Sequence, residues 1–121
     1  MIVVEKLINT LRPLVDNKIY RQGTFSENKE YPKLFITFWE NESNDKSHYD
    51  NVITHGIRHL FDVNVYGSYD EEVYDTLDLI ITALKNNGFI VDGKGIDVPS
   101  DEPNFIGRHI DVIYLDYGKE N

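Results

Sequence analysis

The sequence contains no cysteine, and this absence removes several classes of protein from consideration. Without thiols there is no disulfide framework, no thiolate nucleophile and no cysteine-ligated zinc site. Long apolar runs are also missing, since none approaches the roughly 20 residues that cross a bilayer as a helix. No charged and then apolar leader precedes the first expected helix. We therefore expect a single domain over residues 1–121, made in the cytoplasm and without a membrane partner.

Basic residues are few, because 12 Lys and Arg stand against 21 Asp and Glu, and the formal net charge is −9. This balance disfavours a surface that grips phosphate backbones, since such binding needs clustered cations. An acidic surface aids solubility, and it can also border a path along which DNA passes without adhering. Aromatic residues are plentiful, with 8 Tyr and 6 Phe. Aromatic side chains serve cores and protein interfaces alike, so this excess is compatible with oligomerisation.

The strongest structural pattern runs from Ile57 to Val91 and predicts a strand, a helix and a second strand. Apolar residues alternate with Asp62 and Asn64 in its first part, as in a strand with one buried face. Ser68 and Glu71 have the spacing of a capping box, which predicts that the helix begins there. An apolar stripe at helical spacing follows, formed by Val73, Leu77, Ile80, Ile81 and Leu84.

The rest of the chain predicts one more helix and further strands. Residues 2–15 repeat apolar side chains at helical spacing and predict a first helix that Pro13 ends or bends. Asn87-Gly88 predicts a left-handed exit from the second helix. Short runs of β-forming residues predict strands at residues 19–22, 33–40 and 106–117. The element order predicts an α+β fold, with two helices packed on one face of a mostly antiparallel four- to five-stranded sheet.

Two segments are predicted to be loops. Residues 41–56 are polar with few apolar anchors, and residues 92–105 contain Gly93, Gly95 and two prolines. A long polar connection in a small domain is either functional or an ordinary surface loop. The strand at residues 33–40 is apolar on both faces, which implies a helix on one face and, on the other, more of this chain or a neighbouring subunit.

No pattern of residues predicts catalysis or metal binding. The histidines at positions 48, 55, 59 and 109 lack the spacing of a zinc site, and the acidic residues between 97 and 102 lack the rhythm of a calcium loop. No glycine-rich loop leads from a strand into a helix, so phosphate binding has no support. His59 and His109 both fall in expected strands and could face each other. We predict no catalytic residue, no cofactor and no metal ligand, and a protein that is not an enzyme.

Five segments, taken in order, give the chain its layout: NKIYRQG, YPKLFITFWE, HLFDVNVYG, SYDEEVYDTLDLIITALKNNGF and GRHIDVIYLDY. With the N-terminal helix before them, they span most of the chain. This layout resembles the tail-terminator, or tail-completion, proteins of siphophages, a family that includes related head–tail joining proteins. The resemblance implies a single tail-terminator-like domain over residues 1–121.

The resemblance also implies a non-enzymatic virion protein of the tail or neck, which forms a ring, commonly a hexamer. Its partners would be copies of itself, the tail tube protein and the head–tail connector protein, and DNA would pass through the lumen without specific binding. Contacts between unlike surfaces close into such a ring when the rotation between subunits allows it. The candidate interface residues are Phe35, Trp39, Tyr49, Tyr66, Tyr69, Ile96, Phe105 and Tyr117.

Two alternatives stay open. The first is a neck or head-completion protein that binds the connector rather than the tube. The second belongs to another class, a small ligand-binding or hydrolytic domain whose pocket includes His59, His109 and nearby acidic residues.

Overall fold

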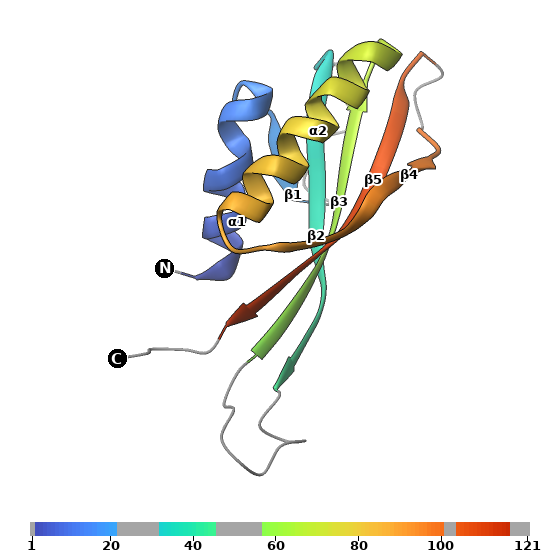
Figure 1. Ribbon diagram of the computed structural model, residues 1–121. Helices are drawn as coiled ribbons and strands as arrows, with labels where there is room; N and C mark the ends of the chain where they lie inside the picture. The colour runs from blue at the N-terminus through green and yellow to red at the C-terminus, as the bar shows by residue number, and fades with distance from the viewer. Residues whose placement is uncertain (1, 22–31, 46–56, 101–103, 117–121) are drawn as a thin grey trace.

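Five strands and two α-helices make up the described part of the chain, which in the computed structural model comprises residues 2–21, 32–45, 57–100 and 104–116. In chain order the elements are α1 (Val3–Leu11), a short 3₁₀ helix η1 (Arg12–Val15), β1 (Ile19–Arg21), β2 (Leu34–Asp45), β3 (Ile57–Gly67), α2 (Asp70–Asn86), β4 (Ile90–Val98) and β5 (Ile106–Asp116). The strands form one sheet, and both helices pack on the same face of it (Figure 1). The predicted α+β fold is confirmed.

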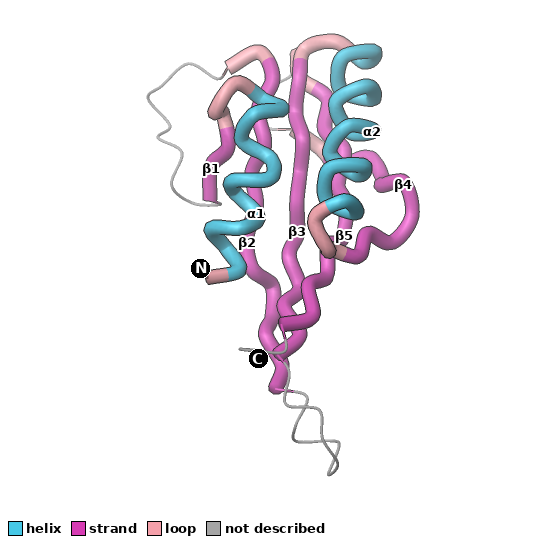
Figure 2. The backbone as a smooth tube through the Cα atoms, turned by 60° about the vertical axis from the view of Figure 1, so that its left-hand side comes forward, coloured by secondary structure: helices cyan, strands magenta, loops and turns pink. Residues whose placement is uncertain are grey.

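The sheet has the strand order β1-β2-β3-β5-β4. Only β1 and β2 pair in parallel, and the other three pairings are antiparallel. The strand β3 therefore lies at the centre, while β1 and β4 form the edges. The three strands β2, β3 and β5 continue beyond the ends of the helices as a projection (Figures 1 and 2).

One hydrophobic core lies between the helices and the sheet. Alternate residues of β3 point into it, as the predicted period of two requires, and Phe61, Val63 and Val65 are almost completely buried. The apolar stripe of α2 covers these residues, so the predicted helical stripe is confirmed. The remaining core residues come from α1, η1, the other strands and the turn after α2: Val3, Leu7, Leu11, Val15, Ile36, Phe38, Phe89, Val91, Ile110 and Val112.

The start of α2 differs from the prediction. The helix begins at Asp70 after the N-cap residue Tyr69, which makes no side-chain capping bond, so the capping box of Ser68 and Glu71 is wrong. The backbone N–H of Ser68 donates to the Lys33 carbonyl oxygen at 3.2 Å, which holds this residue beside the start of β2 instead of at the helix cap. Three acidic residues in the first turn still lie at the positive end of the helix dipole.

The end of α2 follows the prediction. Gly88 takes a φ of 87°, and its N–H donates to the Lys85 carbonyl oxygen. The N–H of Phe89 donates to the Leu84 carbonyl oxygen at 2.9 Å. These two hydrogen bonds form a Schellman motif, and its two apolar residues, Leu84 and Phe89, both belong to the hydrophobic core. The first helix likewise ends as predicted, because α1 stops at Leu11 and the chain continues through Pro13 as the tighter helix η1.

Two predicted loops are partly strands. Residues 41–45 extend β2 to Asp45 and pair with β3, although their sequence is polar. The pairing supplies their backbone hydrogen bonds, so the strand does not depend on β-forming side chains. Residues 46–56 lie outside the described part of the chain.

Residues 92–98, predicted as a turn-rich spacer, belong to β4. Asp92 pairs with Asp111, and Ile96 pairs with His109. The register against β5 therefore shifts, because four residues along β4 cover the same length as two residues along β5. Gly93 and Gly95 take φ values of 78° and 94° within this segment, which we call the β4 bulge. Glycine is suited to these positive φ angles, so the glycines bend the strand without ending it. Residues 101–103 are not described.

Candidate functional site

The sheet face that points away from the helices, which we call the open face, gathers polar and aromatic side chains. Successive side chains of a strand alternate between faces. Because Phe61, Val63 and Val65 face the helices, the residues between them face the other side. The strand residues of the open face include Tyr20, Phe35, Thr37, Trp39, Arg58, Leu60, Asp62, Asn64, Tyr66, Ile90, Asp92, Ile96, Val98, Gly107, His109, Asp111, Ile113 and Leu115. No helix of the described chain lies on this face (Figure 2).

Paired residues of antiparallel strands lie side by side on one face, so the open face is built in rows. The first row is aromatic. The rings of Phe35 and Tyr66 stack at a centroid distance of 5.3 Å, and the Phe105 ring lies 6.0 Å from Phe35. Gly107 faces Tyr66 on β5 and leaves space for its ring, because a Cβ atom there would lie 2.6 Å from the ring edge. The row therefore buries Phe35 within the chain, leaving it only 5% exposed.

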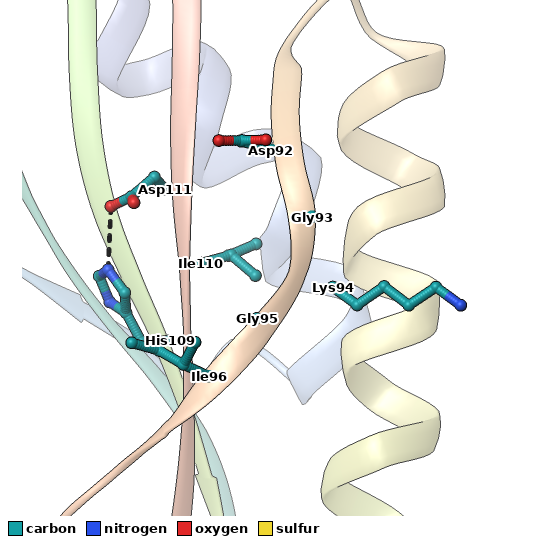
Figure 3. Close-up of a pocket in the computed structure, with 8 residues that line it drawn as sticks. All are labelled: Asp92, Gly93, Lys94, Gly95, Ile96, His109, Ile110 and Asp111. Atoms are coloured by element: carbon teal, nitrogen blue, oxygen red, sulfur yellow. Dashed lines mark hydrogen bonds and ion pairs between the residues drawn. The ribbon is translucent and has the colours of Figure 1, made fainter.

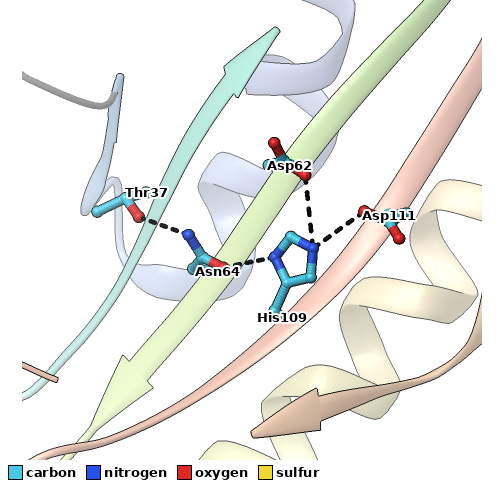
Figure 4. A network of polar contacts seen from close by, with 5 residues as sticks. All are labelled: Thr37, Asp62, Asn64, His109 and Asp111. Atoms are coloured by element: carbon cyan, nitrogen blue, oxygen red, sulfur yellow. Dashed lines mark hydrogen bonds and ion pairs between the residues drawn. The ribbon is translucent and has the colours of Figure 1, made fainter. Parts of the chain in front are cut away.

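The second row is polar and contains Thr37, Asn64 and His109 on three adjacent strands. The Asn64 amide nitrogen donates to the Thr37 hydroxyl at 3.5 Å, so its carbonyl oxygen points toward β5 (Figure 4). That oxygen lies 2.7 Å from Nδ1 of His109. Since an amide oxygen only accepts, Nδ1 of His109 carries the proton and donates it.

The third row is acidic. Asp62 pairs with Asp111, and Asp111 pairs with Asp92, so three carboxyl groups follow one another across β3, β5 and β4. Nε2 of His109 reaches into this row, 3.0 Å from Asp111 Oδ1 and 3.5 Å from Asp62 Oδ1 (Figure 4). We call the three side chains of Asp62, His109 and Asp111 the His109 cluster. Their donor atoms all lie within 4.8 Å of one another, and each side chain could offer one atom to a cation.

Burial raises the pKa of the Asp62 carboxyl above its ordinary value. Asp111 acts in the same direction, because a hydrogen bond between the two side chains favours the protonated Asp62 carboxyl and because two facing carboxylates repel each other. His109 and a hydrogen bond from the Trp39 side chain oppose this shift, since both favour the ionised carboxylate. Asp62 is thus a partly buried acid that lies between His109 on one side and the Asp111 carboxyl group on the other.

A pocket of about 210 Å³ lies beside this cluster, between the β4 bulge and residues 109–111 of β5 (Figure 3). Arg108 holds the bulge from the other side of the sheet. Its guanidinium group donates to Asp97 Oδ1 at 2.7 Å and to the Gly95 carbonyl oxygen at 2.9 Å. It also lies 5.1 Å from the centre of the Tyr74 ring on α2. The bulge is therefore fixed to both β5 and α2, and the pocket is part of the fold.

The two strand histidines do not face each other. His59 lies on the same side of the sheet as Phe61, near the projecting end of β3, whereas His109 lies on the open face. His59 forms an ion pair through Nδ1 with Glu40, and its Nε2 lies 4.0 Å from Asp116 Oδ2. The expectation that the two histidines face each other is wrong, because the alternation of side chains along β3 and β5 places His59 and His109 on opposite faces of the sheet. A pocket that includes both histidines is excluded for the same reason.

The predicted interface residues occupy several places. Trp39 and Ile96 are exposed on the open face, and Tyr66 and Phe105 cover Phe35 in the aromatic row. Tyr69 is 66% exposed, but it lies at the N-cap of α2. Tyr49 and Tyr117 lie outside the described residues. The structure thus brings most of the described members to one face and leaves Tyr69 apart.

The sequence-based alternative grouped His109 with His59 and unspecified acidic residues, so it did not identify Asp62 and Asp111 as the neighbours of His109. A signal was present in the alternation of Asp62-Val63-Asn64 and His109-Ile110-Asp111. In both triplets a core residue separates two polar residues, which places the polar pair on the face opposite the core. Only the pairing of β3 with β5 in the observed register brings the two pairs together.

Comparison with known proteins finds no family model that matches the chain, and no curated protein sequence matches it significantly. Neither helix in the described ranges combines the length and the apolar composition that a membrane-spanning helix needs.

Proposed function

We propose that this chain is a non-enzymatic virion protein of the tail-terminator kind, which assembles through its open face into a ring. The ring would cap the tail tube and join it to the head connector. The observation that carries the proposal is the apolar surface of the open face. Three large apolar side chains are exposed there: Trp39 at 44%, Ile90 at 47% and Ile96 at 63%.

These side chains belong to a larger apolar frame around the polar centre of the open face. The aromatic row borders the centre on one side. On the other side Leu60, Ile113 and Ile90 form an apolar row at paired positions of β3, β5 and β4. Trp39 and Ile96 flank the centre at its two ends. Large exposed apolar side chains that gather on one face of a protein favour a site of association there.

The two edge strands of the sheet are poorly suited to pair with a strand of a neighbouring chain, which favours association through the open face instead. The edge strand β1 has three residues, and the edge strand β4 is interrupted by its bulge. Short and bulged edges present few free backbone groups in register, so a neighbouring chain gains little by pairing with them. Side-chain packing of the open face against a different surface of the next copy is the better route to a ring, because contacts between unlike surfaces can close into one. The net charge of −9 supports the passage of DNA through such a ring without adhesion.

The proposal is tested by the assembly state of the purified chain, measured by light scattering after size exclusion and by negative-stain microscopy. We expect rings in the wild type, alone or when purified tail tube protein is added. Ile96→Glu should give monomers, because it places a charge in the apolar frame. Leu79→Glu is the matched control, since Leu79 is similarly exposed but lies on α2.

Thermal unfolding followed by circular dichroism should show that both variants keep the fold. A wild-type chain that stays monomeric and neither caps nor binds tubes would contradict the proposal. Binding to connector rings without binding to tubes would instead indicate the neck protein.

A further inference from the structure

The acidic row of the open face is unfavourable as the described chain stands. Asp62, Asp111 and Asp92 occupy directly paired positions on three adjacent strands. Like charges at such positions repel each other and destabilise the sheet. Within the described residues, the ion pairs of Asp62 and Asp111 involve His109 alone. Lys94 of the β4 bulge points away from Asp111 and toward α2 (Figure 3).

His109 is oriented so that one ring nitrogen serves both carboxylates. Its Nδ1–H is donated to Asn64, which leaves Nε2 between Asp62 and Asp111. A cation between Nε2 and the two carboxylate oxygens, either the proton of an imidazolium ring or a metal ion, offsets their mutual repulsion. Histidines that bind metal ions show the same arrangement, because the nitrogen away from the metal donates its proton to an oxygen acceptor.

The two distances from Nε2 of His109 to the carboxylate oxygens suit a single metal ion. Two ligand atoms about 2.1 Å from one ion lie roughly 3.0–3.4 Å apart at octahedral or tetrahedral angles. Nε2 of His109 lies 3.0 Å from the Asp111 oxygen and 3.5 Å from the Asp62 oxygen. The ligands stand at paired or neighbouring positions of two central strands, so little rearrangement is needed.

We infer that Asp62, His109 and Asp111 form a binding site for a divalent first-row transition-metal ion, with Asn64 as a positioning residue. Coordination of the ion by Asp62 and Asp111 offsets the repulsion between their carboxylates. One imidazole with two carboxylates suits Zn²⁺ or Mn²⁺, and the nitrogen ligand favours these ions over Mg²⁺ and Ca²⁺. Asp92 strengthens the negative potential that attracts the ion. The site does not depend on ring formation.

The experiment is a calorimetric titration of the full chain, freed of metal by a chelator, with ZnCl₂, MnCl₂ and MgCl₂ in turn. We expect one Zn²⁺ or Mn²⁺ per chain, a higher melting temperature with either ion, and at least tenfold weaker binding of Mg²⁺. Asp111→Asn should weaken Zn²⁺ binding at least tenfold and keep the fold, since this side chain is 57% exposed. His109→Gln should weaken it at least as much, and Asn64→Ala about 10- to 100-fold.

His59→Gln is the matched control. His59 also lies near two carboxylates, but they meet opposite ring nitrogens and therefore do not converge on one point. This variant should bind Zn²⁺ as tightly as the wild type. Nitrogen chemical shifts add a readout that a structural role would not change, because Zn²⁺ should shift Nε2 of His109 and leave His59 unchanged.

The inference fails if the wild type binds neither Zn²⁺ nor Mn²⁺. It fails equally if His109→Gln and Asp111→Asn bind as tightly as the wild type, since the ion would then lie elsewhere. Loss of binding in His59→Gln with retention in His109→Gln would also overturn it.

Discussion

The two faces of the same central strand have opposite characters. On the covered face, β3 presents Phe61, Val63 and Val65 to the helices, and these side chains are almost completely buried. On the open face, the same strand presents Asp62, Asn64 and Tyr66 in polar and aromatic rows. The covered face is what a stable fold requires, because burial of each large apolar side chain contributes about 1.5–3 kcal/mol.

The open face has a composition that stability alone does not require. Facing aspartates lower the stability of the sheet, and exposed isoleucines add nothing to the core. This contrast supports the two proposals that place association and metal binding on the open face. The two strand histidines show the same contrast, since His59 distributes its acidic neighbours over two ring nitrogens and His109 gathers them on one.

The largest expected effect comes from truncation of the covered face. Phe61→Ala should lower the free energy of unfolding by about 3–5 kcal/mol, since it removes a fully buried ring from the centre of the core. Ile96→Ala on the open face should change it by less than about 0.5 kcal/mol. Urea unfolding followed by circular dichroism measures both values. Equal losses in the two variants would mean that the open face is covered within the chain itself.

A smaller loss is expected where the open face is closely packed. Gly107→Ala places a Cβ atom about where the Tyr66 ring and Val98 now lie, at 2.6 and 2.9 Å. The ring must then move away from Phe35, and we expect a loss of roughly 1–3 kcal/mol in the free energy of unfolding. Tyr66→Ala with and without Gly107→Ala is the control, because without the ring the added methyl group is close only to Val98 and should cost less. If the single variant is as stable as the wild type, the aromatic row is loosely packed.

The smallest expected effect is a gain in the free energy of unfolding instead of a loss. Without metal, Asp62→Asn should raise the free energy of unfolding at neutral pH by roughly 0.5–1 kcal/mol, because it removes the repulsion from Asp111. The pKa of Asp62 is higher in the folded chain than in the unfolded chain. The wild type therefore has its full stability from this group below the ordinary Asp pKa of 3.8 and loses it as the pH rises through the folded-state pKa. The gain should therefore shrink in acid.

Unfolding with a chelator present, at neutral and at acid pH, measures this gain. Asp92→Asn at the exposed end of the acidic row is the control and should show a smaller gain. A destabilised Asp62→Asn chain would indicate that the ionised carboxylate is held by His109 and Trp39 more strongly than Asp111 repels it.

Much of the fold could be predicted from local patterns. The helical stripe of α2 and the Asn87-Gly88 exit were predicted correctly, because residues within a single element decide them. Residues 41–45 and the β4 bulge were predicted as loops, since their side chains carry no strand signal. Their backbone groups are paired by β3 and β5, which are distant in the sequence. The His109 cluster could not be predicted, because its members come from two strands more than 40 residues apart.

The sequence by itself determined the alternation of apolar and polar residues, the helix stripes and hence the α+β class, since periods of two and 3.6 residues act within single elements. Only the tertiary structure decided which polar residues became neighbours. A shift of one residue in the register of β3 against β5 would turn Asp62 toward the core and separate it from His109. Register is set by packing of the whole covered face, so the open face takes its arrangement from the core behind it.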